Sequence, residues 1–270
     1  MIAVTEPRVV LAPNPGLMTG PGTNQYVLGD DAPLVIDVAP YDAENARRFA
    51  SGLEGATPSA ILLTHIHPDH VGGAPALREA TGAPLAVHAR RATFPWSGAP
   101  LAPERVLEDG DEIVHAGGRL RVLHAPGHES GHVCYYDPDR RWLFTGDVIL
   151  GTGTTVIAPP DGDMNAYLTT LRRLAALDLA RIYPGHGPAI DHPAETIAEY
   201  IAHRLMRERQ IVDALDAGID RVPAIVARLY AEIHPGLHGA AALTVRAHLA
   251  KLVGDGVVVE EPDDRFRLRT

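Results

Sequence analysis

The sequence predicts an α+β fold in which a part built of alternating strands and helices precedes a smaller, mostly helical part. Two observations predict it. Over the first 190 residues, short apolar segments that end in glycine or polar loops recur between segments with apolar residues at helical spacing. After about residue 192, one long and two shorter helical segments come before two strand-like segments. We therefore expect two domains, 1–194 and 195–270.

In the first domain, local patterns predict each element in turn. The expected strands lie at 24–38, which holds two joined by a Gly-Asp-Asp turn, at 59–65, in several pieces within 85–146, and at 180–187. The expected helices span 42–54, 70–82 and 164–178. The second domain is expected to begin with a long helix over 193–218. Two shorter helices over 221–234 and 241–256 and a strand pair over 257–270 follow, which is the order of a winged-helix unit.

Composition excludes several classes of protein. A hydrophobic content of 46% in 270 residues excludes a disordered chain, and the single cysteine, Cys134, excludes a disulfide scaffold or a thiolate zinc cluster. The net charge of −10 gives no support to general binding of nucleic acid or anionic membranes. Because the N-terminus lacks a secretory pattern and no apolar run approaches about 18 residues, we expect a soluble cytoplasmic protein.

The strongest motif is Thr-His-Ile-His-Pro-Asp-His at 64–70, directly after the stiff, buried strand expected at 59–63. Such a strand end can hold side chains in fixed positions at a cleft. The candidate ligands of this motif are His65, His67, Asp69 and His70. The spacing can direct two imidazoles at one metal ion and a carboxylate plus an imidazole at a second. These groups suit zinc and similar divalent ions in catalytic sites.

Three further candidates each follow a predicted strand and stand next to glycine: His128, Asp147 and His186. Glycine lets the backbone approach a crowded centre at low steric cost. Strand ends that converge on one edge of a sheet sandwich would bring all seven candidate ligands together. We therefore predict a centre of two divalent metal ions, with zinc expected and iron or manganese as alternatives.

At these residues the sequence resembles the metallo-β-lactamase-fold hydrolases, and the resemblance covers about residues 10–190. The five-part motif of that superfamily is matched in order by Asp37, the 65–70 cluster, His128, Asp147 and His186. The resemblance implies a four-layer αβ/βα sandwich followed by the winged-helix-like domain. It places His65, His67 and His128 on one ion, Asp69, His70 and His186 on the second, and Asp147 between both. Asp37 would orient the metal-binding loop from behind the ligands, with a simple turn carboxylate as the alternative role.

Four further segments and the C-terminal domain resemble the lactamase-beta-2-like group of that superfamily. The segments are 146–158, 162–168, 182–188 and 200–210. The eukaryotic branch of the group is described as an endoribonuclease specific for single-stranded RNA. Bacterial relatives in the group are usually described only as metal-dependent hydrolases. The resemblance therefore implies a metal-dependent hydrolase, with single-stranded RNA slightly favoured as its substrate. The alternatives are a hydrolase of thioesters, esters or lactones of the glyoxalase II type, and a nucleic-acid-binding regulator with a non-catalytic scaffold. The expected partner is thus a small-molecule or single-stranded RNA substrate, and no membrane.

The expected reaction is hydrolysis, because two divalent ions that share a bridging water lower its pKa and deliver hydroxide. Asp69 and His132 are the candidate catalytic residues, with His132 as a candidate proton donor to the leaving group and a structural histidine as the alternative. A small basic patch in the C-terminal domain is formed by Arg246, Lys251, Arg265, Arg267 and Arg269. An edge strand with one solvated face explains this patch more simply, and we expect the domain to cap the active site.

Overall fold

A computed structural model describes residues 6–39, 43–90 and 101–269 and divides the chain into two units. The first unit comprises Met1–Ala125, Gly131–Gly153 and Asp178–Pro193. The second comprises Pro126–Ser130, Thr154–Leu177 and Ala194–Thr270. The two units are therefore not simply consecutive in the sequence, because two short segments from before residue 178 belong to the second unit.

Two sheets form the first unit. One sheet has the order β1 (Arg8–Leu11), β2 (Asn24–Leu28), β3 (Leu34–Ile36), β4 (Ala60–Leu62), β5 (Leu85–His88) and β6 (Arg105–Leu107). The other has the order β11 (Arg181–Pro184), β10 (Trp142–Gly146), β9 (Val133–Asp137), β8 (Gly118–His124) and β7 (Glu112–His115). Strands β3 to β6 run parallel, as do β10 and β11, so their carboxyl ends lie at a common edge within each sheet.

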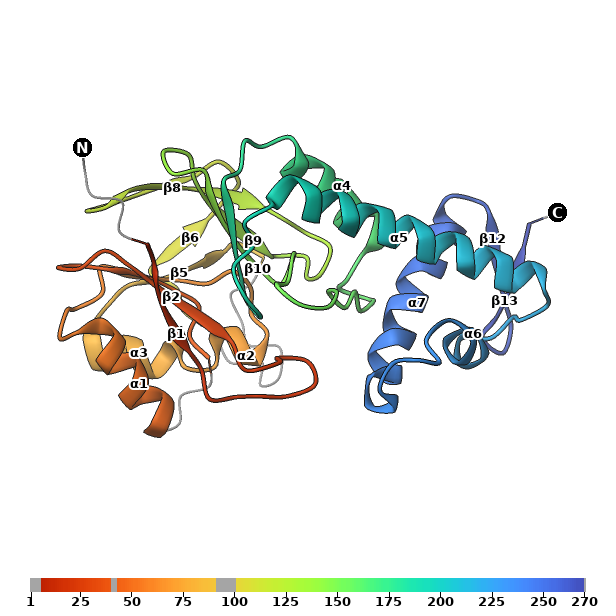
Figure 1. Cartoon of the computed structure of the whole chain (residues 1–270), viewed down its shortest axis with the longest axis horizontal. Coiled ribbons are helices and arrows are strands. Elements are labelled where there is room, and N and C mark those ends of the chain that lie inside the picture. Colours follow the sequence, from red (N-terminus) through yellow and green to blue (C-terminus); the bar gives the residue numbers. More distant parts are fainter. Residues whose placement is uncertain (1–5, 40–42, 91–100, 270) are drawn as a thin grey trace. The chain divides into compact units, whose positions relative to one another are not determined.

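Helices cover the outer face of the first sheet. They are α1 (Ala43–Leu53), α2 (Pro68–Val71) and α3 (Ala74–Thr81), and Figure 1 shows α1 and α3 on the side of β1 and β2 that faces away from β8. Phe49 and Leu53 of α1 and Leu77 of α3 are buried against Ile61 and Leu85 of the sheet. Both faces of β4 are thus covered, which explains why its sequence is a continuous apolar run.

Aromatic rings fill the space between the two sheets. Phe144 of β10 is fully buried, stacks on Tyr183 with ring centroids 5.1 Å apart, and meets the edge of Tyr26 at 5.1 Å. The Tyr26 hydroxyl crosses from the first sheet to donate a hydrogen bond to the carbonyl of Pro184 at 2.6 Å. This contact ties the middle of β2 to the end of β11, next to where polar side chains gather.

The second unit has the winged-helix order that the sequence predicts. Its elements are α4 (Met164–Ala175), α5 (Pro193–Asp216), α6 (Val222–Leu229), a 3₁₀ turn (Pro235–Leu237), α7 (His238–Gly254) and the strands β12 (Val258–Glu261) and β13 (Arg265–Leu268). Ile211 of α5, Ile225 of α6 and Leu249 of α7 pack with Val258 and Phe266 of the strand pair into one core. The expected α+β class with a C-terminal winged helix is confirmed.

Two local predictions differ from the structure. The helix expected over 70–82 is two helices, α2 and α3, because Gly72 and Gly73 interrupt it. Strand β1 escaped prediction because prolines flank it at 7 and 13, and proline is typical of turns and edge strands. Within the described residues, no helix is both long and apolar enough to cross a membrane.

The ring cluster between the sheets predicts a large stability cost for its removal. Phe144→Ala should lower the free energy of unfolding by about 3–5 kcal/mol, because it empties a fully buried site. Urea denaturation followed by circular dichroism measures this change. Val114→Ala, at a side chain that is 79% exposed, is the control and should change stability by less than about 0.5 kcal/mol. Equal midpoints for the two variants would contradict this account of the core.

Candidate metal centre

Polar side chains gather where strands of both sheets end. Asp37 follows β3, His65 follows β4, Asp147 follows β10, and His186 lies two residues beyond β11. The parallel pairing of β10 with β11 places Asp147 and His186 at the same edge. The short helix α2, which begins at Pro68, adds the side chains of its second and third residues, Asp69 and His70. The convergence of strand ends expected from the sequence is therefore what the first unit shows.

Four donor atoms from these residues lie close to the Nε2 atoms of His70 and His186. His70 Nε2 lies 3.2 Å from His186 Nε2, 3.3 Å from Asp147 Oδ1 and 3.7 Å from Asp69 Oδ2. His186 Nε2 lies 3.2 Å from Asp69 Oδ2 and 3.5 Å from Asp147 Oδ1. Ligand atoms held 2.0–2.1 Å from a tetrahedral zinc ion lie about 3.4 Å from one another. The five distances are close to this value, so His70 and His186 together with either carboxylate have the spacing of ligands to one divalent ion.

Hydrogen bonds decide which nitrogen of each buried imidazole faces these donor atoms. His70 Nδ1 donates to Asp37 Oδ2 at 2.7 Å, so the hydrogen of a neutral ring is on Nδ1 and Nε2 keeps its lone pair. The Thr64 hydroxyl donates to the same carboxylate at 2.7 Å and accepts from His65 Nδ1 at 3.0 Å. The Thr64 backbone N–H donates to Asp37 Oδ1 at 2.8 Å. One carboxylate thus orients two of the predicted ligands.

Backbone carbonyls orient two other histidines in the same way. His186 Nδ1 donates to the carbonyl of Gly22 at 3.1 Å, and His128 Nδ1 donates to the carbonyl of Val156 at 2.7 Å. His128 and Val156 both belong to the second unit. Hydrogen bonding at Nδ1 leaves Nε2 for a metal ion, which is the usual arrangement around histidine ligands. Sequence reasoning missed these carbonyl partners and Thr64, although Thr64 directly precedes His65.

Electrostatics within the first unit favour a cation at the cluster. Burial favours the neutral imidazole, yet the carboxylates of Asp147, Asp69 and Asp37 raise the pKa of His70 well above its usual value. The pKa of His186 is raised in the same way against burial, mainly by Asp69. Burial opposes ionisation of Asp69, but His70 and His186 hold the pKa of its carboxyl below the usual range. The carboxylates therefore attract positive charge, and metal binding would displace protons.

His65 links this cluster to the other predicted residues of the first unit. Its ligand atom lies within 4.8 Å of those of His70 and Asp147, and its ring centroid is 4.7 Å from that of His67. His132 is fully buried, stacks on His65 at 4.7 Å, and its Nε2 accepts from the backbone N–H of Asp147 at 3.2 Å. That contact favours a positioning role for His132, and its role as a proton donor stays a prediction.

Two glycines leave the space that the cluster needs. A Cβ on Gly185 would lie 2.7 Å from Asp147 Oδ1 and 2.7 Å from His70 Cε1. A Cβ on Gly146, whose φ is +46°, would lie 2.5 Å from the Thr64 hydroxyl oxygen. Any other residue would push apart side chains that converge here. The donor types, their spacing and this glycine cradle all fit a divalent metal ion.

Comparisons with known proteins agree with this geometry. A family model described as the metallo-beta-lactamase superfamily matches residues 18–186, and one described as a beta-lactamase associated winged helix domain matches 222–267. A beta-lactamase-like protein 2 homolog from Caenorhabditis elegans is 32% identical over 268 residues, which cover 96% of this chain and 88% of that protein. An atrochrysone carboxyl ACP thioesterase from Paecilomyces divaricatus is 35% identical over 220 residues, which cover 78% of this chain and 65% of that protein.

Solved structures show the same fold. A metallo-beta-lactamase family protein from Thermus thermophilus has a TM-score of 0.84 and 24% identity, and the match covers 97% of this chain and 98% of that one. A second structure, determined in a di-iron-bound form, has a TM-score of 0.55 and 32% identity, with coverage of 71% and 96%. The first likeness concerns the fold alone.

The glycine cradle gives a direct prediction. Gly185→Ala should weaken metal binding by about 10–100-fold, because the added methyl group displaces the Asp147 carboxylate and the His70 ring. Competition with a chromophoric chelator measures the affinity. Gly239→Ala is the matched control, since a Cβ there meets nothing within 4 Å. Unchanged affinity in Gly185→Ala would show that the cluster does not bind the metal.

Proposed function

Because this chain belongs to the metallo-β-lactamase superfamily and brings His65, His70 and Asp147, and likewise Asp69, His70 and His186, within metal-binding distance, we propose that it is a hydrolase that works with two divalent metal ions. The spacing of the four donor atoms, 3.2–3.7 Å, is the observation that carries the proposal. A non-catalytic scaffold would have no use for so complete a set of ligands, and this argues against a purely regulatory protein.

The ligands divide into two sets. The proposed ligands of one ion are His65, His67 and His128, those of the second are Asp69, His70 and His186, and Asp147 serves both. Support for the second set comes from its interatomic distances. Support for the first comes from the 4.7 Å between the ring centroids of His65 and His67, and from the family motif, which His128 matches. Zinc is the proposed metal, because imidazole and carboxylate groups are its usual ligands in catalytic sites.

Divalent ions in such a centre lower the pKa of bound water and polarise the bond to be cleaved. The residues of the chain orient the side chains that would bind these ions. The Asp37 carboxylate keeps a hydrogen on His70 Nδ1, and the Thr64 hydroxyl holds the His65 ring. Asp69 is 26% exposed at its side chain, whereas His70 is fully buried. The Asp69 carboxylate is thus more open to substrate and solvent than the His70 ring, which suits the catalytic role proposed for it.

We propose a thioester as the substrate class. A relative that is 35% identical is named as a thioesterase that acts on an acyl carrier protein. Hydrolysis of a thioester requires an activated water and a polarised carbonyl, both of which a metal centre supplies. The net charge of −10 does not hinder this reaction, whereas it opposes the approach of a polyanion.

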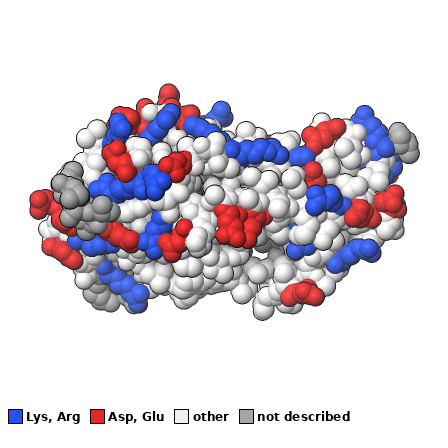
Figure 2. Space-filling view, turned by 45° about the horizontal axis from the view of Figure 1, so that its top comes forward, with Lys and Arg blue, Asp and Glu red and all other residues white. Residues whose placement is uncertain are grey.

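The charges of the second unit give little support to the alternative, cleavage of single-stranded RNA. Four of the five cations of the expected basic patch, all except Arg269, form ion pairs within the described residues. Arg246 pairs with Asp264 at 2.5 Å, Lys251 with Glu208 at 3.0 Å, and Arg265 with Asp220. Arg267 likewise pairs with Glu261 at 2.5 Å. Figure 2 shows basic and acidic side chains interspersed rather than gathered into a basic surface. Phosphate binding would have to break these pairs, so RNA is the second candidate.

A substrate comparison tests this proposal. We expect the zinc-loaded chain to hydrolyse an acyl thioester, with no cleavage of labelled single-stranded RNA, and Asp69→Asn to lower kcat/KM by at least about 100-fold. The loss follows from removing a negatively charged ligand that holds two histidines in place. Free thiol released from the thioester and gel analysis of the RNA are the two measurements.

Glu79→Gln on α3 is the matched control for loss of one carboxylate and should leave both rates unchanged. RNA cleavage that disappears in Asp69→Asn would overturn the thioester assignment and keep the metal centre. Turnover of neither substrate in a fully loaded chain would overturn the proposed substrate classes. A chain that binds no metal would overturn the hydrolase proposal itself.

A further inference from the structure

A buried arginine of the second unit lies behind the backbone that orients one proposed metal ligand. Arg204 of α5 is only 2% exposed. Burial of a guanidinium is costly unless its N–H groups find acceptors. Its Nη2 donates to the carbonyl of Thr155 at 2.5 Å, and its positive charge lies over the Tyr167 ring of α4, 5.2 Å from the centroid. Arg204 thus joins α5 both to α4 and to the segment that precedes α4.

Thr155 directly precedes the residue whose carbonyl orients His128. The Val156 carbonyl accepts from His128 Nδ1 at 2.7 Å. This carbonyl shares one planar peptide unit with the backbone N–H of Ile157, which donates to the Thr244 hydroxyl of α7 at 3.4 Å. The bond from α5 holds the preceding peptide unit, through the Thr155 carbonyl. Helices of the second unit therefore hold the peptide units on both sides of Val156.

The loop that carries His128 rests on α4 in the same unit. The Gly127 carbonyl accepts from the backbone N–H of Asp163, the N-cap of α4, at 2.8 Å. A Cβ on Gly127 would lie 2.3 Å from Tyr167 Cα, so this loop contacts the helix backbone directly. The ring of the same tyrosine lies under the Arg204 guanidinium. Loss of that guanidinium would therefore disturb both ends of the hydrogen bond at His128 Nδ1.

The direction of the Val156 carbonyl decides the tautomer of His128. A neutral imidazole has one N–H, and the carbonyl keeps that hydrogen on Nδ1. The lone pair that a metal ion needs is then on Nε2. If the carbonyl turned away, the hydrogen could move to Nε2 and the ring could rotate, so metal affinity would fall.

We propose that Arg204 is a positioning residue for the first metal ion, because it holds the backbone that orients His128. Thr244 supports the same backbone from α7. This role rests on the ligand role proposed above for His128 and extends it, since helices of the second unit then set the affinity of the centre for its first ion. Arg204 acts through Thr155 and Val156 rather than by contact with substrate.

Stepwise zinc binding to the full chain, measured by competition with a chromophoric chelator, tests this role. Arg204→Met removes the N–H donors and keeps an unbranched side chain. We expect it to weaken one of the two zinc-binding steps about tenfold and to leave the other within about twofold. His128→Gln identifies that step, because it removes the ligand itself and should weaken the same step by about 100-fold.

The effects of the two changes should not add. In the His128→Gln background, Arg204→Met should cause no further loss of zinc affinity, because Arg204 acts through that ring. A further loss of about tenfold would overturn the proposal. An unchanged step in Arg204→Met, when His128→Gln weakens it, would do the same. An unchanged step in His128→Gln would instead overturn the ligand role of His128, and the role of Arg204 with it.

Arg207→Met is the matched control within the second unit. Arg207 lies one turn along α5 from Arg204, with its guanidinium over the Tyr230 ring at 4.5 Å, and donates to the Leu229 carbonyl at 2.9 Å. It therefore resembles Arg204 but holds the end of α6 instead. Arg207→Met should bind both zinc ions like the unchanged chain.

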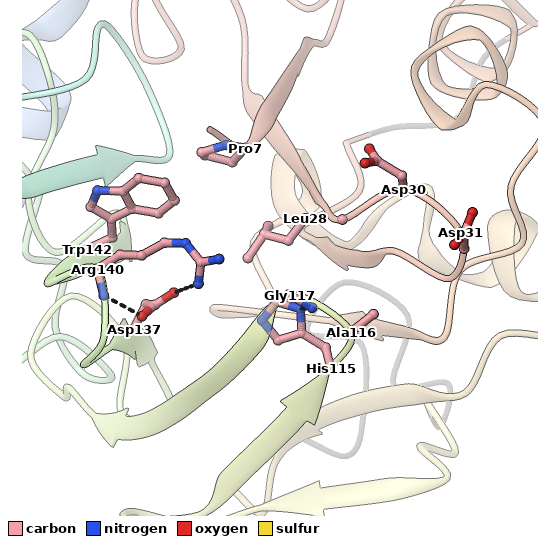
Figure 3. A pocket seen from close by; sticks show the side chains of 11 residues that line it. Pro7, Leu28, Asp30, Asp31, His115, Ala116, Gly117, Asp137, Arg140 and Trp142 are labelled. Carbon is pink, nitrogen blue, oxygen red and sulfur yellow. Dashed lines mark hydrogen bonds and ion pairs between the residues drawn. The ribbon is translucent and has the colours of Figure 1, made fainter. Parts of the chain in front are cut away.

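Arg140→Met is the control in the first unit. Arg140 lies over the Trp142 ring at 5.5 Å and donates to Asp137 at 2.9 Å, in the pocket that Figure 3 shows. This substitution, too, should leave both binding steps unchanged. Equal losses in the three methionine variants would overturn the assignment to Arg204, because a general loss of stability would then explain them.

Two further variants decide the question if Arg204→Met does not fold. Arg204→Lys keeps a charged donor for the Thr155 carbonyl and should keep the affinity within about threefold. Thr244→Val has the same shape but no acceptor for the Ile157 N–H, and should weaken the same step about threefold. It should also speed exchange of the His128 Nδ1 hydrogen with solvent, which ¹⁵N NMR of the histidine rings measures. Unchanged affinity and exchange in Thr244→Val, or a loss of about tenfold in Arg204→Lys, would overturn the proposal.

Discussion

The carboxylate of Asp37 is the contact on which the candidate metal centre depends. It is buried, carried on a left-handed backbone with φ of +61°, and accepts hydrogen bonds from the Thr64 backbone, the Thr64 hydroxyl and His70 Nδ1. Through these bonds it sets the tautomer of His70 and, by way of Thr64, the orientation of His65. A non-glycine residue in this conformation is uncommon, and such strain is typical of functional sites. The carboxylate held in this way organises His65 and His70 at the two ends of the 64–70 motif.

Much of the fold follows from local sequence patterns. The apolar run before Thr64 and the apolar spacing of α4 predict a buried strand and an amphipathic helix, and the structure has both. Where local patterns do not determine an element or its boundaries, contacts with the rest of the chain do. The two glycines at 72–73 divide one helical pattern into α2 and α3, and the proline-flanked β1 gains its strand conformation from pairing with β2. Assignment of 126–130 and 154–177 to the second unit has no local signal, because it depends on contacts far along the chain.

In the candidate metal centre, too, local sequence patterns predict some features and tertiary contacts decide others. The proposed ligands stand out in the sequence because metal chemistry restricts residue types, as the 64–70 motif and the glycine-flanked residues Asp147 and His186 show. The groups that orient these side chains could not be predicted from the sequence. The carbonyls of Gly22 and Val156 belong to the backbone, and every residue has one.

Anomalous diffraction from crystals of the zinc-loaded chain, recorded at the zinc absorption edge, tests the proposed metal centre most directly. We predict two peaks, one of them in contact with Asp69, His70, Asp147 and His186, with His70 Nδ1 still bonded to Asp37. No anomalous peak at this cluster, or a zinc ion bound to His70 through Nδ1 after loss of the Asp37 contact, would contradict the proposed centre and the role of Asp37 in it.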